Sequence, residues 1–424
     1  MEEINKQAFN MMEISNKVVE LCLECEEELR ERFNEIENIC MLNTAKVLNA
    51  FHEERISETH FRATTGYGYD DIGRDAIEKV YAKIFNTEDA LVRINFVNGT
   101  HALSTALAGN LMPGDLLVSI TGAPYDTLAE TIGIVENSMS LMNMGVMYKQ
   151  VELKDGTFDI EAVQDIVKNN KVKMIFIGRS RGYETRPSQN ISQIENVISK
   201  IKEIDESVIV MVDNCYGEFV ETKEPTVVGA DILAGSLIKN LGGGLCETGG
   251  YIAGKKNLVE NAAKRLTAPG IGKECGASLG KNKEILQGLF MAPQAVKNSL
   301  KTAVLTAAML EKLGYDVTPN AWEDRTDIIQ TIILKDKNKL ISFIQGVQAA
   351  SPIDSFVLPM PWDMPGYTNE VIMAAGTFVS GASIELSCDA PIKEPYAVFM
   401  QGGLTYESAK LGVCIAIDKM LKGE

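Results

Sequence analysis

One stretch of the sequence decides the fold: Ala234-Gly235-Ser236-Leu237-Ile238-Lys239-Asn240-Leu241-Gly242-Gly243-Gly244. The apolar run Ile232–Leu237 is typical of a buried strand, and Lys239 and the glycines follow where that strand ends. A second apolar run, Val208–Val212, ends in Asp213. Ligands of α/β sheets bind beyond the carboxyl ends of the strands. We therefore expect Lys239 and Asp213 to face one site at that edge.

The region around this stretch alternates between short apolar runs and helical stretches. The alternation predicts a mainly parallel sheet with helices on both faces, which is the α/β fold class. The other runs that we interpret as strands are Ala90–Phe96, Leu116–Ile120, Val172–Ile177 and Tyr251–Ala253.

Both ends of the chain have a different pattern. Apolar residues recur at helical spacing from residue 15 to 51, and helices are expected over 300–313 and 406–421. We expect a helical arm over residues 1–60, a large domain over 61–300 and a smaller α+β domain over 301–424. The strands expected in the small domain are Ile328–Leu334, Val371–Ala375, Ser383–Ser387 and Ala397–Met400.

The composition argues against several classes of function. The chain carries 58 acidic and 41 basic residues, for a formal charge of −17, whereas nucleic acid selects clustered Lys and Arg. No apolar stretch reaches the roughly 18 residues of a membrane span, and the N-terminus lacks a signal-peptide pattern. We therefore expect a cytoplasmic protein with no nucleic-acid or membrane partner. Cys22 and Cys25 form a lone C-x-x-C in a helical pattern, so no metal site is expected.

Lys239 and Asp213 together indicate a site for pyridoxal phosphate (PLP). A half-buried amine loses its proton readily and can form a Schiff base with the aldehyde, while an acid keeps the pyridine nitrogen protonated. The Ser236 hydroxyl can reach the phosphate. The alternatives are a surface lysine at a glycine turn and an aspartate that caps a helix.

Two further turns supply the remaining contacts that PLP requires. Gly99, Thr100 and His101 begin a helix directly after the first strand, where free N–H groups favour a phosphate. Tyr125 follows the next strand and can stack on the cofactor ring. A plain helix start and a core tyrosine are the alternatives.

An arginine cluster follows the strand Val172–Ile177. Arg179, Arg181 and Arg186 lie within ten residues of each other. A planar guanidinium binds a carboxylate through two hydrogen bonds, so we expect Arg179 and Arg181 to bind the carboxylate of an amino-acid substrate. A solvated basic loop is the alternative.

The chain resembles a known family over nearly its whole length. Asn98–Ala102, Tyr125, Asp213 and Ser236-x-x-Lys239, in that order, resemble the fold-type I PLP enzymes of the transsulfuration group. Longer motifs resemble the methionine gamma-lyase-like family, often labelled cystathionine beta-lyase-like or aluminium-resistance protein. These motifs are Thr65–Arg74, Ser180-Arg181-Gly182-Tyr183, Pro361–Tyr367 and Gln401–Glu407.

The resemblance implies a homodimer or homotetramer with active sites shared between subunits. It implies that Tyr67 and Tyr69 belong to a loop that reaches the phosphate of a neighbouring subunit. The wider group binds the substrate carboxylate with an arginine late in its small domain, whereas here Gly381–Ser387 contains no arginine. This departure returns the role to Arg179 and Arg181.

Our hypothesis from the sequence is a PLP-dependent carbon–sulfur lyase that cleaves a sulfur-containing amino acid by β- or γ-elimination. Lys239 forms the Schiff base and acts as general base, and Tyr125 is a second catalytic residue. One alternative is another PLP reaction, such as transamination or aldol cleavage. The other is a PLP-binding protein without fast turnover.

Overall fold

The computed structural model describes residues 2–182, 184–363 and 369–423. These fall into two compact units, one formed by residues 1–41 and 292–424 and the other by residues 42–291. The division differs from the expected one, because the N-terminal residues group with the C-terminal unit instead of standing as an arm. Tyr183 and residues 364–367, which belong to two of the family motifs, lie outside the described residues.

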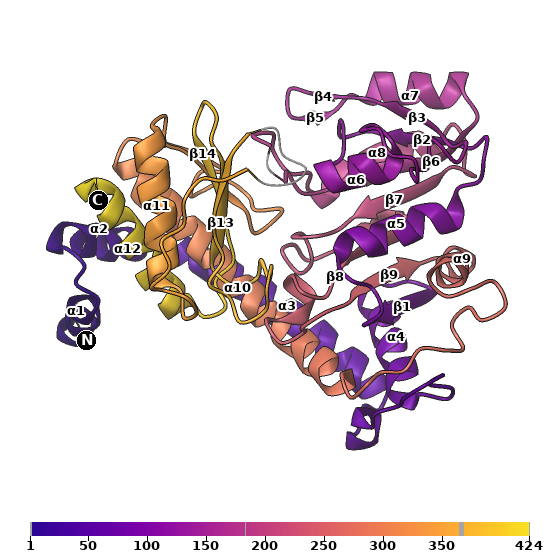
Figure 1. The fold of residues 1–424 in the computed structure, drawn as a ribbon, viewed down its shortest axis with the longest axis horizontal. Coiled ribbons are helices and arrows are strands. Elements are labelled where there is room, and N and C mark those ends of the chain that lie inside the picture. Colours follow the sequence, from indigo (N-terminus) through magenta and orange to yellow (C-terminus); the bar gives the residue numbers. More distant parts are fainter. Residues whose placement is uncertain (1, 183, 364–368, 424) are drawn as a thin grey trace. The chain divides into compact units, whose positions relative to one another are not determined.

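The larger unit contains a seven-stranded sheet in the order β1-β9-β8-β7-β6-β2-β3 (Figure 1). Its elements in chain order are α4 (Ile72–Ile84), β1 (Asp89–Arg93), α5 (Gly99–Asn110), β2 (Leu116–Ser119), α6 (Asp126–Ile132), β3 (Met147–Gln150), β4 (Leu153–Lys154), β5 (Thr157–Phe158), α7 (Ile160–Asn169), β6 (Val172–Gly178), α8 (Ile191–Lys202), β7 (Ile209–Asp213), β8 (Ile232–Ser236), β9 (Gly250–Gly254) and α9 (Lys256–Leu266). The helices α3 (Arg30–Glu53) and α10 (Asn282–Lys312) each contain one of the boundaries between the units.

The sheet confirms the mainly parallel α/β class. Strands β8, β7, β6, β2 and β3 run parallel to one another, and β9 is antiparallel to both β8 and β1. The carboxyl ends of β1, β2, β6, β7 and β8 therefore lie at one edge of the sheet. Every turn that the sequence singled out as chemically informative, apart from the tyrosine loop before α4, follows one of these ends.

The helices α5 and α9 pack together beside β8 and β9 and complete a core in this unit. Its members include Leu103 and Leu107 of α5, Val259 of α9 and Met211 of β7, none of which has measurable exposure. Because these side chains exclude water, α5 is fixed relative to β7 and β8. Its first residues are therefore held at the edge where those strands end.

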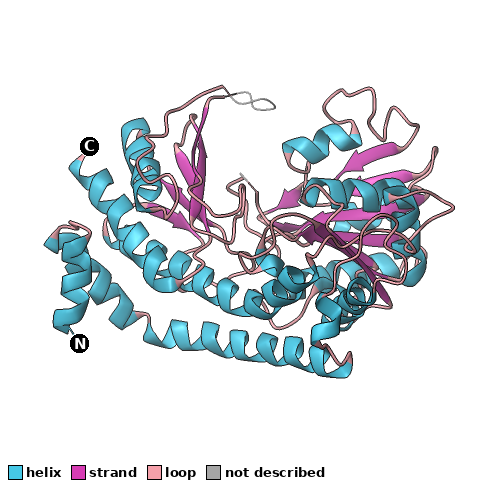
Figure 2. Ribbon diagram, turned by 60° about the horizontal axis from the view of Figure 1, so that its bottom comes forward, coloured by secondary structure: helices cyan, strands magenta, loops and turns pink. Residues whose placement is uncertain are grey.

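The smaller unit contains a five-stranded sheet in the order β10-β11-β14-β13-β12. Figure 2 shows its strands with helices beside them. Its elements are α1 (Glu2–Met11), α2 (Asn16–Glu28), β10 (Asp316–Thr318), β11 (Gln330–Ile333), α11 (Lys337–Ala350), β12 (Val371–Ala374), β13 (Ser387–Pro391), β14 (Ala397–Gln401) and α12 (Tyr406–Lys422). In the described ranges no helix is both long enough and apolar enough to cross a membrane.

Two expected elements differ in the smaller unit. The predicted strand Ser383–Ser387 is wrong, because β13 begins only at Ser387. The Glu385 carboxylate instead accepts hydrogen bonds from the backbone N–H groups of Phe378 (3.0 Å) and Val379 (3.1 Å), which ties that segment into a turn. The helix expected from residue 300 begins already at Asn282 and continues through Pro293.

Candidate active site

Lys239 and Asp213 lie at the same edge of the sheet. Asp213 is the last residue of β7 and pairs with Ala234 of β8, and Lys239 lies three residues beyond the end of β8. The Asp213 Oδ1 accepts a hydrogen bond from the Cys215 N–H at 3.1 Å. Burial raises the pKa of Asp213, although the Lys239 amine and the Cys215 N–H oppose that rise. The structure therefore brings these two residues together, as the strand ends predicted.

The Lys239 amine has an acidic environment. Its Nζ lies 3.9 Å from the centroid of the Tyr216 ring. Burial acts to lower the pKa of Lys239, but Cys215, Tyr216, Asp213 and Tyr125 act to raise it, and the net direction is well above the ordinary value. The free lysine is therefore an ammonium at neutral pH.

The N-terminus of α5 lies beside Ser236. The Asn98 side chain accepts a hydrogen bond from the His101 N–H at 2.9 Å, which leaves the first two N–H groups of the helix, those of Gly99 and Thr100, without an intrahelical acceptor. A Cβ at Gly99 would lie 3.1 Å from the Ser236 Cβ and 3.4 Å from the Cys215 Sγ. Glycine here keeps open a space that any side chain would narrow.

Tyr125 joins this group through its hydroxyl. The phenol oxygen lies 2.9 Å from the Thr100 Oγ1, which itself lies 3.3 Å from the Thr127 Oγ1. Burial, followed by the charge of Asp213 and the thiol of Cys215, raises the pKa of Tyr125, so the phenol keeps its proton. The side chain remains 39% exposed, so its ring is accessible to a ligand.

His101 is turned toward the preceding loop. Its Nδ1 accepts a hydrogen bond from the Val97 N–H at 3.2 Å, and its ring packs edge-on against Phe96 with centroids 5.5 Å apart. Burial lowers the pKa of His101, so the imidazole is neutral. Because Asn98 occupies its backbone N–H, His101 shapes the turn and has no free N–H there for a phosphate.

Arg179 does not have the role that we expected. It has no measurable exposure, and its Nη1 donates to the Asn214 Oδ1 (2.8 Å) and the Gly217 carbonyl (2.9 Å). Its Nη2 forms an ion pair with Glu221 at 2.7 Å. Since these acceptors of the protein already occupy both terminal nitrogens, Arg179 braces the loop after β7 and does not bind a substrate carboxylate.

Two arginines of the same cluster lie nearby. Arg181 is 3% exposed, and its Nε donates to the Ser188 Oγ at 3.3 Å. Arg186 donates through Nη2 to the carbonyls of Gly178 (3.2 Å) and Ser180 (2.7 Å), and its charge acts to lower the pKa of Asp213. Arg186 therefore lies at the carboxyl ends of β6 and β7.

The tyrosine loop, residues 64–71, displays its aromatic rings to solvent. Tyr67 and Tyr69 are 72% and 59% exposed and stack on each other with ring centroids 5.5 Å apart. A side-chain hydrogen bond with Cys275 raises the pKa of the Tyr69 phenol. The contacts described for the two rings do not include Lys239 or Asp213.

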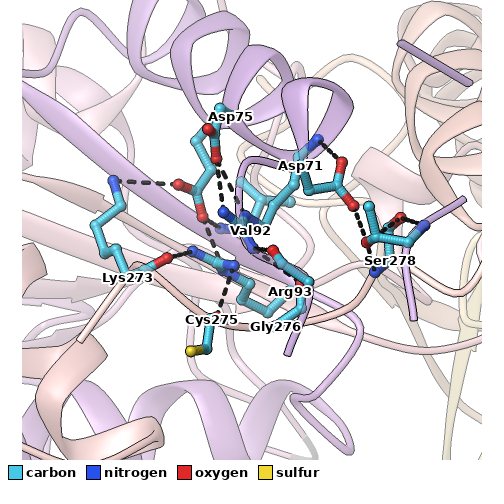
Figure 3. Close-up of polar contacts among 12 residues, drawn as sticks. Asp71, Asp75, Val92, Arg93, Lys273, Cys275, Gly276 and Ser278 are labelled. Carbon is cyan, nitrogen blue, oxygen red and sulfur yellow. Dashed lines mark hydrogen bonds and ion pairs between the residues drawn. The ribbon is translucent and has the colours of Figure 1, made fainter. Parts of the chain in front are cut away.

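Buried polar contacts anchor this loop and its surroundings (Figure 3). Asp71 accepts hydrogen bonds from the Arg74 N–H (2.9 Å) and from Asn282 (3.1 Å). Arg74 donates to the carbonyls of Gly68 (2.6 Å) and Gly276 (3.0 Å). Close by, Arg93 and Glu78 form a buried ion pair at 2.9 Å. Hydrogen bonds therefore anchor the backbone of the loop although its rings are exposed.

Three further residues belong to the site that the sequence did not indicate. Cys215 and Tyr216 directly border Lys239, and Glu218 is a fully buried acid whose Oε1 accepts from the Tyr251 hydroxyl at 2.7 Å. Burial raises the pKa of Glu218 to about 8. Their only sequence signal is position, because they follow Asp213 within five residues on a stretch without any periodic pattern.

The arrangement fits an anionic cofactor with a basic ring nitrogen and an aldehyde. The Gly99 and Thr100 N–H groups and the Ser236 hydroxyl suit a phosphate, and Asp213 suits a pyridine nitrogen. Lys239 suits the aldehyde carbon. Since Gly99 leaves room at this point, the residues present fit PLP.

Comparison with known proteins gives consistent relatives. The family model for methionine gamma-lyase matches residues 18–421. "Uncharacterized protein YnbB" of Bacillus subtilis is 51% identical over 94% of this chain and 96% of its own. A crystal structure from Clostridium acetobutylicum, named as a candidate cystathionine beta-lyase involved in aluminum resistance, is 53% identical with a TM-score of 0.95, and 99% of each chain is covered.

Further solved structures agree. A carbon-sulfur lyase involved in aluminum resistance from Clostridium novyi is 49% identical, with a TM-score of 0.94 over 97% of this chain and 98% of that chain. At 15% identity, the pyridoxal-5'-phosphate dependent protein YhfS from Escherichia coli shares the fold, with a TM-score of 0.60 over 89% of this chain and 95% of that one. Because the family model spans both units almost completely, the chain belongs to the methionine gamma-lyase family of fold-type I proteins.

Proposed function

We propose that this protein is a PLP-dependent carbon–sulfur lyase that cleaves a sulfur-containing amino acid by β- or γ-elimination. The observation that carries the proposal is the meeting of Lys239 and Asp213 beside the N-terminus of α5, at the carboxyl edge of the sheet. Membership of the methionine gamma-lyase family and the lyase names of the close relatives support the reaction class.

Each residue of the site has a defined task in this proposal. Lys239 would hold the cofactor covalently, Asp213 would hold a proton at the pyridine nitrogen, and Gly99, Thr100 and Ser236 would bind the phosphate. Tyr125 offers an accessible ring face for stacking. When bound, PLP supplies an electron sink for the negative charge that develops at the substrate Cα.

The chain's own groups move the protons. The Lys239 Nζ, when it is not bonded to the cofactor, takes the Cα proton as general base. In γ-elimination the same amine removes the second proton at Cβ. The Tyr125 phenol keeps its proton because its pKa is raised, so it can donate a hydrogen bond to the departing sulfur.

The substrate carboxylate requires a cation at this edge. Both terminal nitrogens of Arg179 and of Arg186 already donate to acceptors of the protein, so Arg181, which the sequence also indicated, is the member of the cluster that we propose for this contact. Replacing the binding arginine by Lys should raise KM for the amino acid much more than it lowers kcat, because the contact acts on the bound substrate and its transition state alike. An unchanged KM in Arg181→Lys would remove this cluster from the site.

The first experiment is an absorption spectrum of the purified protein with PLP, before and after borohydride. The visible band of a lysine-linked cofactor should appear, and borohydride should attach the cofactor to the peptide that contains Lys239. Lys239→Ala should lack the band, whereas Lys200→Ala, at the exposed end of α8, should keep it. A band that survives in Lys239→Ala would refute the assignment.

The second experiment follows the products from methionine and from cystathionine. Release of ammonia, a keto acid and a thiol in equal amounts is the result expected of a lyase. Conversion of the cofactor to its pyridoxamine form without release of ammonia would indicate an aminotransferase. Binding of PLP with no product from any sulfur amino acid would indicate a protein that only binds the cofactor.

A further inference from the structure

The loop that follows β7, residues 214–219, holds an unusual backbone. Tyr216 and Phe219 have φ angles of +71° and +61°, in the left-handed region that favours glycine. Non-glycine residues persist in this conformation only where their surroundings enforce it, and such residues cluster at functional sites. The contacts that enforce this backbone conformation therefore indicate the functional role of the loop.

Buried polar groups enforce the conformation of the 214–219 loop. Arg179 donates to the Asn214 Oδ1 at 2.8 Å and to the Gly217 carbonyl at 2.9 Å, one on each side of Tyr216. Glu224 accepts hydrogen bonds from Asn214 (2.8 Å) and from the Phe219 N–H (2.9 Å). A Cβ at position 217 would lie 2.5 Å from the Arg179 Nη1, so the guanidinium fills the space beneath the loop.

The Tyr216 side chain is the one that this arrangement directs at Lys239. The centroid of its ring lies 3.9 Å from Nζ, which is within the range of a cation–π contact. We propose that Tyr216 is a positioning residue whose ring face holds the Lys239 ammonium, and that the Arg179-braced loop 214–219 exists to aim that ring.

The contact would favour the charged form of the lysine. The groups that face Lys239 are Asp213, Cys215, Tyr125 and Glu218 besides Tyr216. Burial opposes an ammonium here, so a ring face that replaces lost water has a large effect. Provided that the proposed function holds, the ring stabilises Lys239 after it has taken the Cα proton, and so strengthens the base.

The test uses the cofactor-free protein, so it does not depend on catalysis. Reductive methylation with formaldehyde and cyanoborohydride, which reduces the imine, labels Lys239 in proportion to its neutral fraction at a fixed pH below the pKa, and mass spectrometry quantifies the peptide. Tyr216→Leu should lower the pKa of Lys239 by about one unit, which gives roughly tenfold faster labelling. Tyr216→Phe, which keeps the ring, should label within about twofold of the wild type.

Two controls distinguish the loss of the ring contact from a general loss of folding. Labelling of Lys200, which lies on the exposed end of α8, should not change in either variant. If Tyr216→Leu does not fold, phenylalanines with increasing fluorination at position 216 keep the shape and weaken the negative ring face. Labelling of Lys239 should then rise steadily with fluorination.

Two results would overturn the inference. Equal labelling of Lys239 in wild type, Tyr216→Leu and the fluorinated series would show that the ring holds no charge. Equal acceleration in Tyr216→Phe and Tyr216→Leu would assign the effect to the phenol hydroxyl. Either result leaves the borohydride experiment intact, and a missing cofactor band would leave the labelling result intact.

Discussion

Two loops of the larger unit carry tyrosines and rest on buried arginines, yet they present their rings in opposite ways. In the 214–219 loop, Arg179 holds the backbone and Tyr216 faces inward onto Lys239. In the tyrosine loop, Arg74 holds the backbone and Tyr67 and Tyr69 face solvent. The buried arginine acts as scaffold in both loops. The direction of the ring decides whether the loop serves its own site or a surface.

The largest effect is expected from removing the brace of the inward loop. Arg179→Ala leaves Glu221 and the buried Glu224 without their partner, so the free energy of unfolding should fall by about 3–5 kcal/mol. Lys200→Ala removes an ion pair to the exposed Glu203 and should cost only about 1 kcal/mol. Urea unfolding of both variants measures the difference. Equal losses would mean that Arg179 is not the scaffold of this loop.

An effect of pH on stability is expected at Glu218, which lies in the same loop but is not among the residues to which Arg179 donates. Its pKa is about 8 in the folded protein, against about 4.3 for an unfolded glutamate. Between these values the folded chain keeps a proton that the unfolded chain has lost, so stability falls as pH rises, by at most about 1.4 kcal/mol per pH unit.

Glu218→Gln imitates the neutral acid and keeps an acceptor for Tyr251. The variant should match the wild type near pH 5 and exceed it near pH 8, with a flatter profile between. Urea unfolding across this range measures both curves. Parallel curves would show that Glu218 is already ionised in the folded protein.

Two glycines of the tyrosine loop form a matched pair that tests how closely its backbone packs against residue 277. Gly66 and Gly68 have similar φ angles of +62° and +58°, but a Cβ at Gly66 meets nothing within 4 Å, whereas one at Gly68 lies 2.6 Å from the backbone of Ala277. Gly66→Ala should cost about 1–2 kcal/mol from backbone strain alone. Gly68→Ala should cost about 1–3 kcal/mol more. Thermal unfolding distinguishes the two, and equal costs would mean that the loop can move away from residue 277.

The smallest effect on stability is expected at the exposed rings themselves. Replacing Tyr67 and Tyr69 together by Ala should change the free energy of unfolding by no more than about 0.5–1 kcal/mol, because the pair contributes little burial. If the rings reach the phosphate site of a neighbouring subunit, affinity for PLP should nevertheless fall. Titration of PLP and sedimentation of both proteins test this, and an unchanged affinity would exclude the role.

The strands of the larger unit were predictable because burial on both faces leaves an unbroken apolar run. Strand β8 is buried throughout, and its apolar run also indicated that Lys239 lies beyond the end of a strand. Strand β3 was missed because it lies at the edge of the sheet, and Met147, Lys149 and Gln150 are exposed. Its sequence therefore has no apolar run to detect.

The roles of the arginines could not be predicted in the same way. An arginine at a strand end is equally compatible with binding a substrate and with binding backbone carbonyls. The role of Arg179 is determined by its hydrogen-bond partners. These are Asn214, Gly217 and Glu221, which lie more than thirty residues away in the sequence. Tyr216 was missed for a related reason, since its direction depends on a φ angle that no sequence pattern indicates.

The order of the two units along the chain has a consequence for synthesis. The unit with the candidate site is continuous from Leu42 to Met291, whereas the other unit combines residues 1–41 with residues 292–424. Domains fold as units while the chain emerges from the ribosome. Residues 1–41 can therefore complete their unit only after the last third of the chain has been synthesised. Until then, their apolar side chains lack the residues that bury them in the folded protein.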